Sequence, residues 1–263
     1  MKHNGAAPQP PTFRVLIATP VQMGQVWCET AHGLLTIALR DGEVPGLTFE
    51  WEQMGGQGVA GARNELAWIA KHVKKCHAVL FWDGDVVTAG PAPTAVLGLV
   101  RHGKHLIGGL YPHKTEAHQT WCANFIPGEV PDANGALKVE DCGAGFLFVT
   151  MHLLDTIVAK GLAPAYSRGY DPRRYPPGTV MHDFFSMGVV KDPMHGGEPT
   201  YKTEDFMLAH KARLAGFDCY VDTQVRLDHM GVHKFKADRP NMPQPWVTTA
   251  ALDGKVVPFT PQS

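Results

Sequence analysis

No stretch of this 263-residue chain approaches the roughly 18 consecutive apolar residues that a membrane-spanning helix needs. Residues 1–12 are polar and proline-rich, without the apolar core of a signal peptide. The net charge is −1, so no overall basic field attracts nucleic acid. The five cysteines are scattered and include no C-x-x-C pair, which argues against a zinc or disulfide framework and suits a reducing compartment. These absences predict a soluble, cytoplasmic protein.

Apolar segments of strand length alternate with helical patterns in the first half of the chain. The length allows one large α/β domain with a substantial core. The pattern predicts strands over 13–19, 47–54, 78–82 and 105–109 and helices over 22–39, 59–75 and 93–101. This β-α-β-α-β order is typical of a doubly wound, mainly parallel sheet with helices on both faces.

Two carboxylates follow the most apolar of these strands. Residues 78–82 read Ala-Val-Leu-Phe-Trp and lead directly into Asp83, Gly84 and Asp85. Ligands of open α/β sheets bind at the carboxyl ends of the strands. Two carboxylates one residue apart repel each other unless a cation lies between them, so the pattern predicts a divalent metal site with a phosphate-bearing ligand. The alternative is a solvated Asp-Gly turn.

The second half of the chain has a different pattern. Strands are predicted over 119–126, 136–141, 145–150, 218–221 and 224–228, and helices over 151–160 and 204–215. Residues 162–202 lack periodicity and are interpreted as one long functional loop. Residues 1–12 are expected to be flexible, and residues 233–263 to form an extended tail. No linker separates the halves, so residues 13–232 are interpreted as one domain, with a nucleotide-binding half (13–110) and an acceptor half (111–232).

A glycine-rich turn offers a competing enzyme class. Gly56, Gly58 and Gly61 fit the G-x-G-x-x-G pattern of dinucleotide folds, with Asp83 near the position of a ribose-binding acid. This predicts an NAD(P)-dependent oxidoreductase. Against it, the preceding strand carries two glutamates, and the acid occurs as Asp-x-Asp.

Seven short motifs, in order, resemble the glycosyltransferases of the GT-A fold, close to family 2 and to small phage-encoded members. They are ATPV (18–21), GARNELA (61–67), LFWDGD (80–85), LIGGLYPHK (106–114), CGAGFLFV (142–149), TEDF (203–206) and LDHMG (227–231). The resemblance covers about residues 13–232 and implies a Rossmann-like, mainly parallel sheet flanked by helices, with a smaller antiparallel acceptor-side part. The implied activity is inverting transfer from a nucleotide sugar, most often a UDP-sugar such as UDP-glucose.

The resemblance also assigns roles to individual residues. Asp83, Asp85 and His229 match ligands of Mn²⁺ or Mg²⁺, and a histidine ligand favours Mn²⁺. Arg63 matches an arginine near the base or phosphates; alternatively it pairs with Glu50 or Glu52. The full set implied to bind the donor is Thr19, Pro20, Val21, Arg63, Trp82, Asp83, Gly84, Gly143 and Gly145.

The catalytic pair implied by the resemblance is Glu204-Asp205, with Asp205 taking the acceptor proton as general base. Acids in the first turn of a helix are also common because they favour the helix dipole. The tight turn at Gly143 and Gly145 matches the place where donor sugar and acceptor meet.

The acceptor does not follow from these residues, but phage relatives suggest a 5-hydroxymethylpyrimidine in DNA, with a glycan or protein as the alternatives. Basic and aromatic residues of the acceptor half and tail could hold backbone phosphate and stack an extruded base, or could form a solvated surface. They are Tyr166, Arg168, Tyr170, Arg173, Arg174, Tyr175, His182, Lys191, Arg226, His233, Lys234, Lys236 and Arg239. A non-catalytic nucleotide- or carbohydrate-binding module is the third class.

Overall fold

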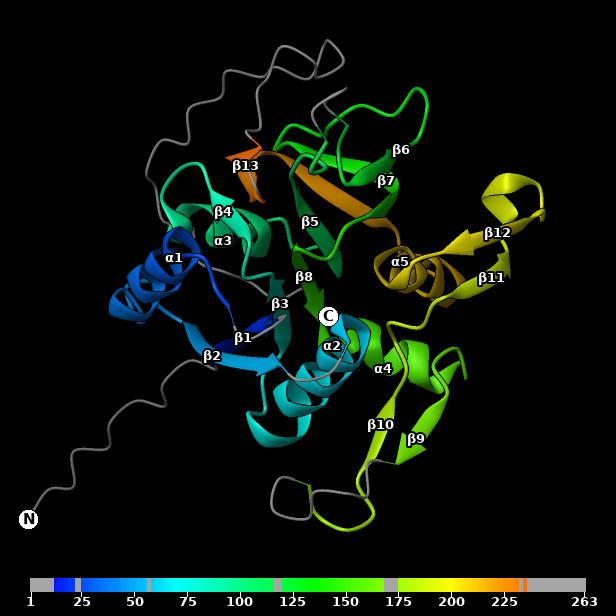
Figure 1. Ribbon diagram of the computed structural model, residues 1–263, viewed down its shortest axis with the longest axis horizontal. Helices are drawn as coiled ribbons and strands as arrows, with labels where there is room; N and C mark the ends of the chain where they lie inside the picture. The colour runs from blue at the N-terminus through cyan, green and yellow to red at the C-terminus, as the bar shows by residue number, and fades with distance from the viewer. Residues whose placement is uncertain are drawn as a thin grey trace, which may run out of the picture.

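The computed structural model describes residues 12–21, 25–55, 58–115, 120–167, 175–231 and 234–235. Within them a large sheet of parallel and antiparallel strands is flanked by helices (Figure 1). Its strands are β1 (Phe13–Val21), β2 (Leu47–Gly55), β3 (Ala78–Trp82), β4 (Val86–Thr88), β5 (Leu106–Leu110), β6 (Ala123–Phe125), β7 (Ala136–Cys142), β8 (Phe146–Thr150), β13 (Cys219–Met230) and β14 (Lys234–Phe235). The α-helices are α1 (Cys28–Leu39), α2 (Val59–Trp68), α3 (Ala92–Arg101), α4 (Met151–Ala159) and α5 (Glu204–Ala215).

The strand order is β2-β1-β3-β8-β5-β13-β7-β6, and β4 and β14 both pair with β13. β1 runs parallel to β2 and β3, as expected for a doubly wound sheet, and β5 runs parallel to β13. β8 is inserted between β3 and β5 and is antiparallel to both. Trp82 pairs with Phe146, so the turn that leads into β8 lies at the carboxyl end of β3. This register brings the 143–145 turn beside Asp83.

The core has two apolar clusters, one on each face of the sheet. Ile17 and Leu80 point toward α1 and α3, whereas Leu16 and Phe81 point toward α2, α4 and α5. Figure 1 shows these helices on the two sides of the sheet. Because both faces are covered, β1 and β3 are almost continuously apolar rather than alternating. Strands buried in this way place the polar residues that follow them at the rim of the sheet.

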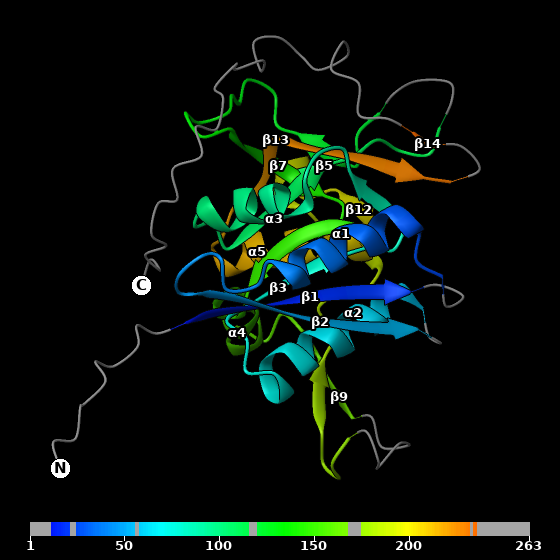
Figure 2. The ribbon, with the colours of Figure 1, turned by 90° about the vertical axis from the view of Figure 1, so that its left-hand side faces the viewer.

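The segment from 162 to 202 is not the single long loop that its composition predicts. It contains two antiparallel hairpins, β9 (Ala165–Ser167) with β10 (Val180–His182) and β11 (Gly188–Lys191) with β12 (Pro199–Lys202). The first projects from the body of the molecule in both views (Figures 1 and 2). Strands of three or four residues are too short to give a periodic sequence signal, which explains the wrong prediction.

Several element boundaries also differ from the predictions. α1 begins at Cys28 rather than at residue 22, because the backbone before it approaches the Asp-Gly-Asp turn and the N–H of Trp27 donates to Gly84 O at 2.8 Å. α2 ends at Trp68 and continues as a π-helical turn to Val73. The two strands predicted between 218 and 228 are one strand, β13, with an irregularity in its pairing to β5. Of the strand predicted over 119–126, residue 119 lies outside the described part of the chain, and residues 120–126 contain the short strand β6.

None of the helices in the described part of the chain combines the length and apolar character needed to cross a membrane. The predicted N-terminal segment and C-terminal tail lie largely outside the described residues.

Candidate active site

Three carboxylates surround the guanidinium of Arg63, whose side chain is only 2% exposed. Nη2 donates to both carboxylate oxygens of Asp83, at 3.0 and 2.9 Å. Nη1 donates to Asp205 and, at 3.3 Å, to Glu204. Asp83 follows β3, whereas Glu204 and Asp205 begin α5. Arg63 therefore joins the Asp-x-Asp turn to the helix that carries the predicted base.

The electrostatics of this group leave an excess of negative charge. Burial by itself lowers the pKa of Arg63, but the charges of Asp205 and Asp83 outweigh it and hold that pKa above its ordinary value. Burial raises the pKa of Asp83 to about 6, although the charge of Arg63 opposes the shift. Burial and the neighbouring Asp205 also raise the pKa of Glu204. One guanidinium thus faces three carboxylates, and the site favours a further cation or proton.

Asp85 and His229 meet at the same edge of the sheet. β4 and β13 pair so that His229 lies opposite Val86, and its Nε2 is 3.8 Å from Oδ1 of Asp85. Nδ1 of His229 lies 2.9 Å from the carbonyl oxygen of Pro112. A carbonyl only accepts, so Nδ1 carries the proton and Nε2 directs its lone pair toward Asp85. Burial lowers the pKa of His229, which favours the neutral imidazole.

This arrangement fits a divalent cation. A neutral imidazole nitrogen and a carboxylate oxygen face each other, and both are acceptors that a cation would satisfy. The carbonyl of Pro112 orients the ring in the way that outer partners orient metal-bound histidines. Lys114 already places an ammonium nitrogen 2.5 Å from Oδ2 of Asp85. Positive charge is therefore accommodated at this carboxylate.

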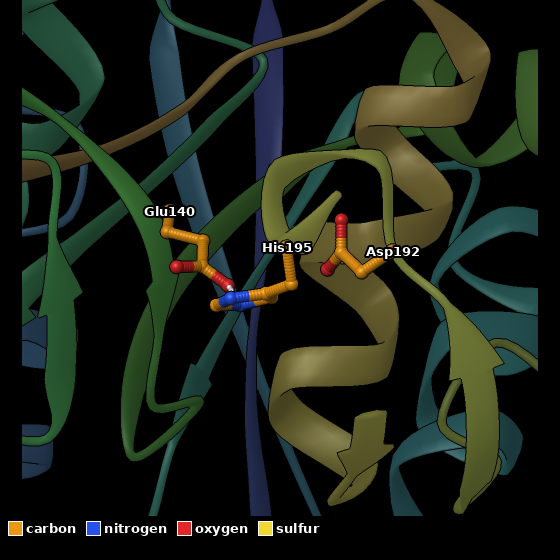
Figure 3. A group of neighbouring side chains, drawn as sticks. All are labelled: Glu140, Asp192 and His195. Carbon is orange, nitrogen blue, oxygen red and sulfur yellow. Dashed lines mark hydrogen bonds and ion pairs between the residues drawn. The ribbon is translucent and has the colours of Figure 1, made fainter. Parts of the chain in front are cut away.

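Another acidic group is a weaker candidate for a metal. Among the described residues, the one set of three potential ligands whose ligand atoms all lie within 4.8 Å of one another is Glu140, Asp192 and His195 (Figure 3). The Lys202 ammonium lies between two of these carboxylates, 2.8 Å from Glu140 and 3.0 Å from Asp192. Arg213 adds a second cation 3.0 Å from Asp192. This group is an ion-pair network that holds β12 and α5 against β7.

The 143–145 turn contacts both the Asp-x-Asp motif and the predicted base. The N–H of Ala144 donates to Oδ2 of Asp205 at 3.0 Å, and the N–H of Asp83 donates to the carbonyl oxygen of Gly145 at 2.9 Å. A Cβ added at Gly143 would lie 2.2 Å from the hydroxyl oxygen of Tyr111. That hydroxyl accepts a hydrogen bond from Gly145 N at 2.8 Å. Glycine is needed here because Tyr111 packs directly on the turn.

The residues implied to cradle the nucleotide lie at the end of β1. Pro20 and Val21 are buried, as is Thr19, whose hydroxyl accepts a hydrogen bond from the indole of Trp51 at 3.0 Å. The turn at Gly84 packs closely, because a Cβ there would lie 3.1 Å from the carbonyl oxygen of Gln25.

Trp82 lies in the core instead of at the donor site that the resemblance implies for it. Its side chain is 0% exposed, its ring packs against Phe146, and its indole N–H donates to the carbonyl oxygen of Val86 at 2.7 Å. It supports the Asp-x-Asp turn from beneath. Arg63 also differs from its alternative interpretation, because Glu50 pairs with Arg14 and Lys74.

The described basic and aromatic residues of the acceptor half do not form one surface. Tyr175 is buried and packs against Trp68, Tyr166 and His182 lie on the β9–β10 hairpin, and Lys191 lies on β11. Arg226 is exposed on β13. The positions outside the described residues are Arg168, Tyr170, Arg173, Arg174, His233, Lys236 and Arg239, together with the side chain of Lys234.

Sequence reasoning missed three residues that the fold brings to this edge: Trp51, Tyr111 and Lys114. Tyr111 directly follows β5, and Lys114 lies in the same connection shortly after it. A position beyond the carboxyl end of a parallel strand is the signal that could have identified them. Trp51 gives no such signal, because its partner Thr19 lies 32 residues away.

Comparisons with known proteins show the fold alone. No protein-family model matches the chain, and no curated protein sequence matches it. Among solved structures, A197 from STIV is similar at a TM-score of 0.51 and 16% sequence identity, over 83% of this chain and 86% of A197. The likeness therefore extends over most of both chains at low sequence identity.

Proposed function

We propose that this chain is a metal-dependent GT-A glycosyltransferase that moves a sugar from a nucleotide sugar, such as a UDP-sugar, to an acceptor hydroxyl. One observation carries the proposal. Arg63 holds the Asp83 carboxylate of the Asp-x-Asp motif and the Asp205 carboxylate of α5 in a single cluster around its buried guanidinium, at the edge of the sheet where α/β folds bind ligands. The ordered motifs that resemble GT-A enzymes supply the reaction class.

Asp85 and His229, with Asp83 beside them, would hold Mn²⁺ or Mg²⁺, and the imidazole favours Mn²⁺. A bound ion supplies neutralisation of the charge that develops on the departing diphosphate. Asp83 has both oxygens engaged by Arg63, so Asp85 is the carboxylate with greater freedom to bind an ion. Arg63 is too deeply buried to serve as a simple phosphate contact and acts here as a positioning residue.

The donor occupies the carboxyl edge of the sheet in this proposal. The segment Thr19-Pro20-Val21 lies against the base, Gly84 and the 143–145 turn allow the diphosphate and sugar to approach the backbone, and the acceptor enters from α5. Trp51 borders the base site through its hydrogen bond to Thr19.

Asp205 is the proposed general base. The acceptor oxygen attacks the anomeric carbon as the bond from that carbon to the diphosphate oxygen breaks. The hydroxyl proton passes to the Asp205 carboxylate, and the electron pair leaves with the nucleotide diphosphate. Arg63 and Ala144 N fix the two oxygens of Asp205 in the ground state, which favours one orientation of the base. Attack opposite to the leaving group inverts the anomeric configuration.

The oxidoreductase alternative fits the structure less well. The glycine-rich turn follows β2, which lies at the edge of the sheet, whereas dinucleotide-binding glycines follow a central strand. Asp83, the candidate ribose-binding acid, is held by Arg63 instead. Gly56 lies outside the described residues.

A screen of nucleotide-sugar hydrolysis tests the proposal directly. Purified protein is incubated with UDP-, GDP-, ADP- and TDP-sugars, with Mn²⁺ or with chelator, and released nucleotide is measured. Metal-dependent hydrolysis of one donor supports the proposal, and the Asp85→Ala variant should lose it. Acceptors are then compared with that donor: glycans, proteins, and DNA with or without 5-hydroxymethylpyrimidines. Binding of NADH without any nucleotide-sugar binding would favour the oxidoreductase, and donor binding without turnover would favour a binding module.

A further inference from the structure

Lys114 lies at the mouth of the candidate metal site, with its Nζ 2.5 Å from Oδ2 of Asp85. The backbone just before it is paired. Pro112 forms a β-bridge with Trp121, and His113 N donates to the carbonyl oxygen of Thr120 at 2.8 Å. These contacts hold the start of this segment against residues 120–122. The ammonium therefore approaches one oxygen of Asp85 while His229 faces the other.

The exposure of this ion pair distinguishes it from the buried pairs of the molecule. The Lys114 and Asp85 side chains are 37% and 34% exposed, whereas Lys202, which lies among the carboxylates of the ion-pair network, is 3% exposed. Exchanging the partners of a half-exposed pair costs little, because water replaces each lost contact. Removing Lys202 would instead take one of two cations from Asp141 and Asp192, which are fully buried and would be left to share Arg213. Lys114 can therefore change partners and Lys202 cannot.

We propose that Lys114 is a resident counter-ion of Asp85 that a divalent cation displaces, and that the freed ammonium then pairs with the diphosphate of the bound nucleotide. The proposal rests on the proposed function for its second half. Its first half follows from charge alone, since an ammonium and a divalent cation repel each other at one carboxylate. A nucleotide diphosphate bound beside the cation supplies the new anionic partner. A lysine suits this role as a flexible point charge.

The two parts of the proposal, displacement by the cation and pairing with the diphosphate, predict effects of opposite sign for Lys114→Met. Without nucleotide, the variant should bind Mn²⁺ more tightly than the wild type, because nothing competes for Asp85. The expected gain is about 1.4- to 5-fold, which corresponds to a surface ion pair of about 0.2–1 kcal/mol. With Mn²⁺ saturating, the variant should bind UDP more weakly, by a factor of similar size. A residue that merely supported the fold would shift both affinities in the same direction.

Calorimetric titration of the 263-residue chain with Mn²⁺, and of the Mn²⁺-loaded protein with UDP, provides the test. Lys138→Met is a matched control, since Lys138 is 38% exposed and pairs with Asp218 at 2.8 Å. It should change neither affinity. Lys114→Arg, which keeps the charge, should keep both close to wild type.

Unchanged or weaker Mn²⁺ binding by Lys114→Met would overturn the counter-ion role, whether or not nucleotide binds. Unchanged UDP affinity in that variant, with normal UDP binding by the wild type, would overturn the second half alone. A wild type that binds Mn²⁺ but no nucleotide would instead overturn the proposed function, and the second half with it.

Discussion

Both carboxylate oxygens of Asp83 accept hydrogen bonds from the Nη2 nitrogen of Arg63, at 3.0 and 2.9 Å, in a site where the arginine is almost fully buried. The pair joins α2, which carries Arg63, to the turn after β3, which carries Asp83. A buried charge needs its partner, since uncompensated burial is costly. The integrity of this edge of the sheet therefore depends on one guanidinium.

Replacing Arg63 by methionine should destabilise the protein by about 3–5 kcal/mol, because three neighbouring carboxylates that are only 18–24% exposed would lose the cation they share. Urea unfolding monitored by circular dichroism measures the change. Arg14→Met is the control: Arg14 pairs with Glu50 but is 39% exposed, so its loss should cost about 1 kcal/mol or less. Equal costs for the two variants would contradict the buried-cluster interpretation.

The pH dependence of stability should report Asp83. Burial raises its pKa to about 6 from an ordinary 3.8, so the folded state binds this proton more tightly than the unfolded state. The contribution to the unfolding free energy is therefore present at low pH and is lost as pH rises from about 4 to about 6. The difference in stability between wild type and Asp83→Asn, measured in chelator, should fall over that range. A difference that stays constant from about pH 4 to about pH 6 would contradict the raised pKa of Asp83.

The metal is expected at Asp85 and His229 rather than at Glu140, Asp192 and His195. His229→Ala should weaken Mn²⁺ binding by roughly tenfold or more, since loss of even an outer partner of a metal ligand costs about 10- to 100-fold. His195→Ala removes an exposed histidine from the ion-pair network and should leave Mn²⁺ affinity unchanged. Calorimetry of the two variants in parallel decides between the sites. The reverse pattern would move the metal to the network.

Asp205→Asn should lose about 10²- to 10⁴-fold in transfer rate while still binding UDP, because it keeps the shape of the side chain and removes the proton acceptor. Single-turnover transfer and UDP calorimetry separate the two effects. Glu204→Gln is the comparison variant, because Glu204 is the other carboxylate of α5 that contacts Arg63. Loss of activity in Glu204→Gln alone would move the base by one residue. A product that retains the anomeric configuration would count against either base.

Gly143→Ala should destabilise the protein by about 1–3 kcal/mol, because the new methyl group would overlap the Tyr111 hydroxyl. The double variant with Tyr111→Phe should recover part of that loss. Gly188→Ala is the control, since a Cβ there meets nothing within 4 Å. Thermal unfolding compares the three variants. A neutral Gly143→Ala would show that the turn is looser than its contacts indicate.

The local features of this protein could be predicted from sequence because their signals are local. Residues 78–82 form β3 as expected, and the helix predicted over 204–215 has the observed bounds of α5. A run buried on both faces is apolar throughout, and a helix that ends at a glycine in the left-handed conformation, here Gly216, has a clear stop signal. The Asp-x-Asp pair at the end of β3 followed from the same reasoning.

Predictions from the sequence are wrong where an element is too short to show a periodic pattern, or where one residue is assigned a role by itself. The short strands of the β9–β10 and β11–β12 hairpins lie in a segment that the sequence predicts to be a loop. Trp82, which the resemblance implies to bind the donor, is fully buried instead. Its burial follows from strand alternation, which turns residue 82 toward the core cluster of α1 and α3.

The composition of the site itself was decided by tertiary structure. Arg63 finds Asp83 20 residues away and Asp205 142 residues away, and Asp85 meets His229 only because β4 pairs with β13. The antiparallel insertion of β8 places the 143–145 turn in contact with both Asp83 and Asp205. No local pattern encodes such partners, since propensity and periodicity act over a few residues. The sequence by itself determined the strands, the helices and the acids at their ends, whereas the order of strands in the sheet decided which of those acids share one cation.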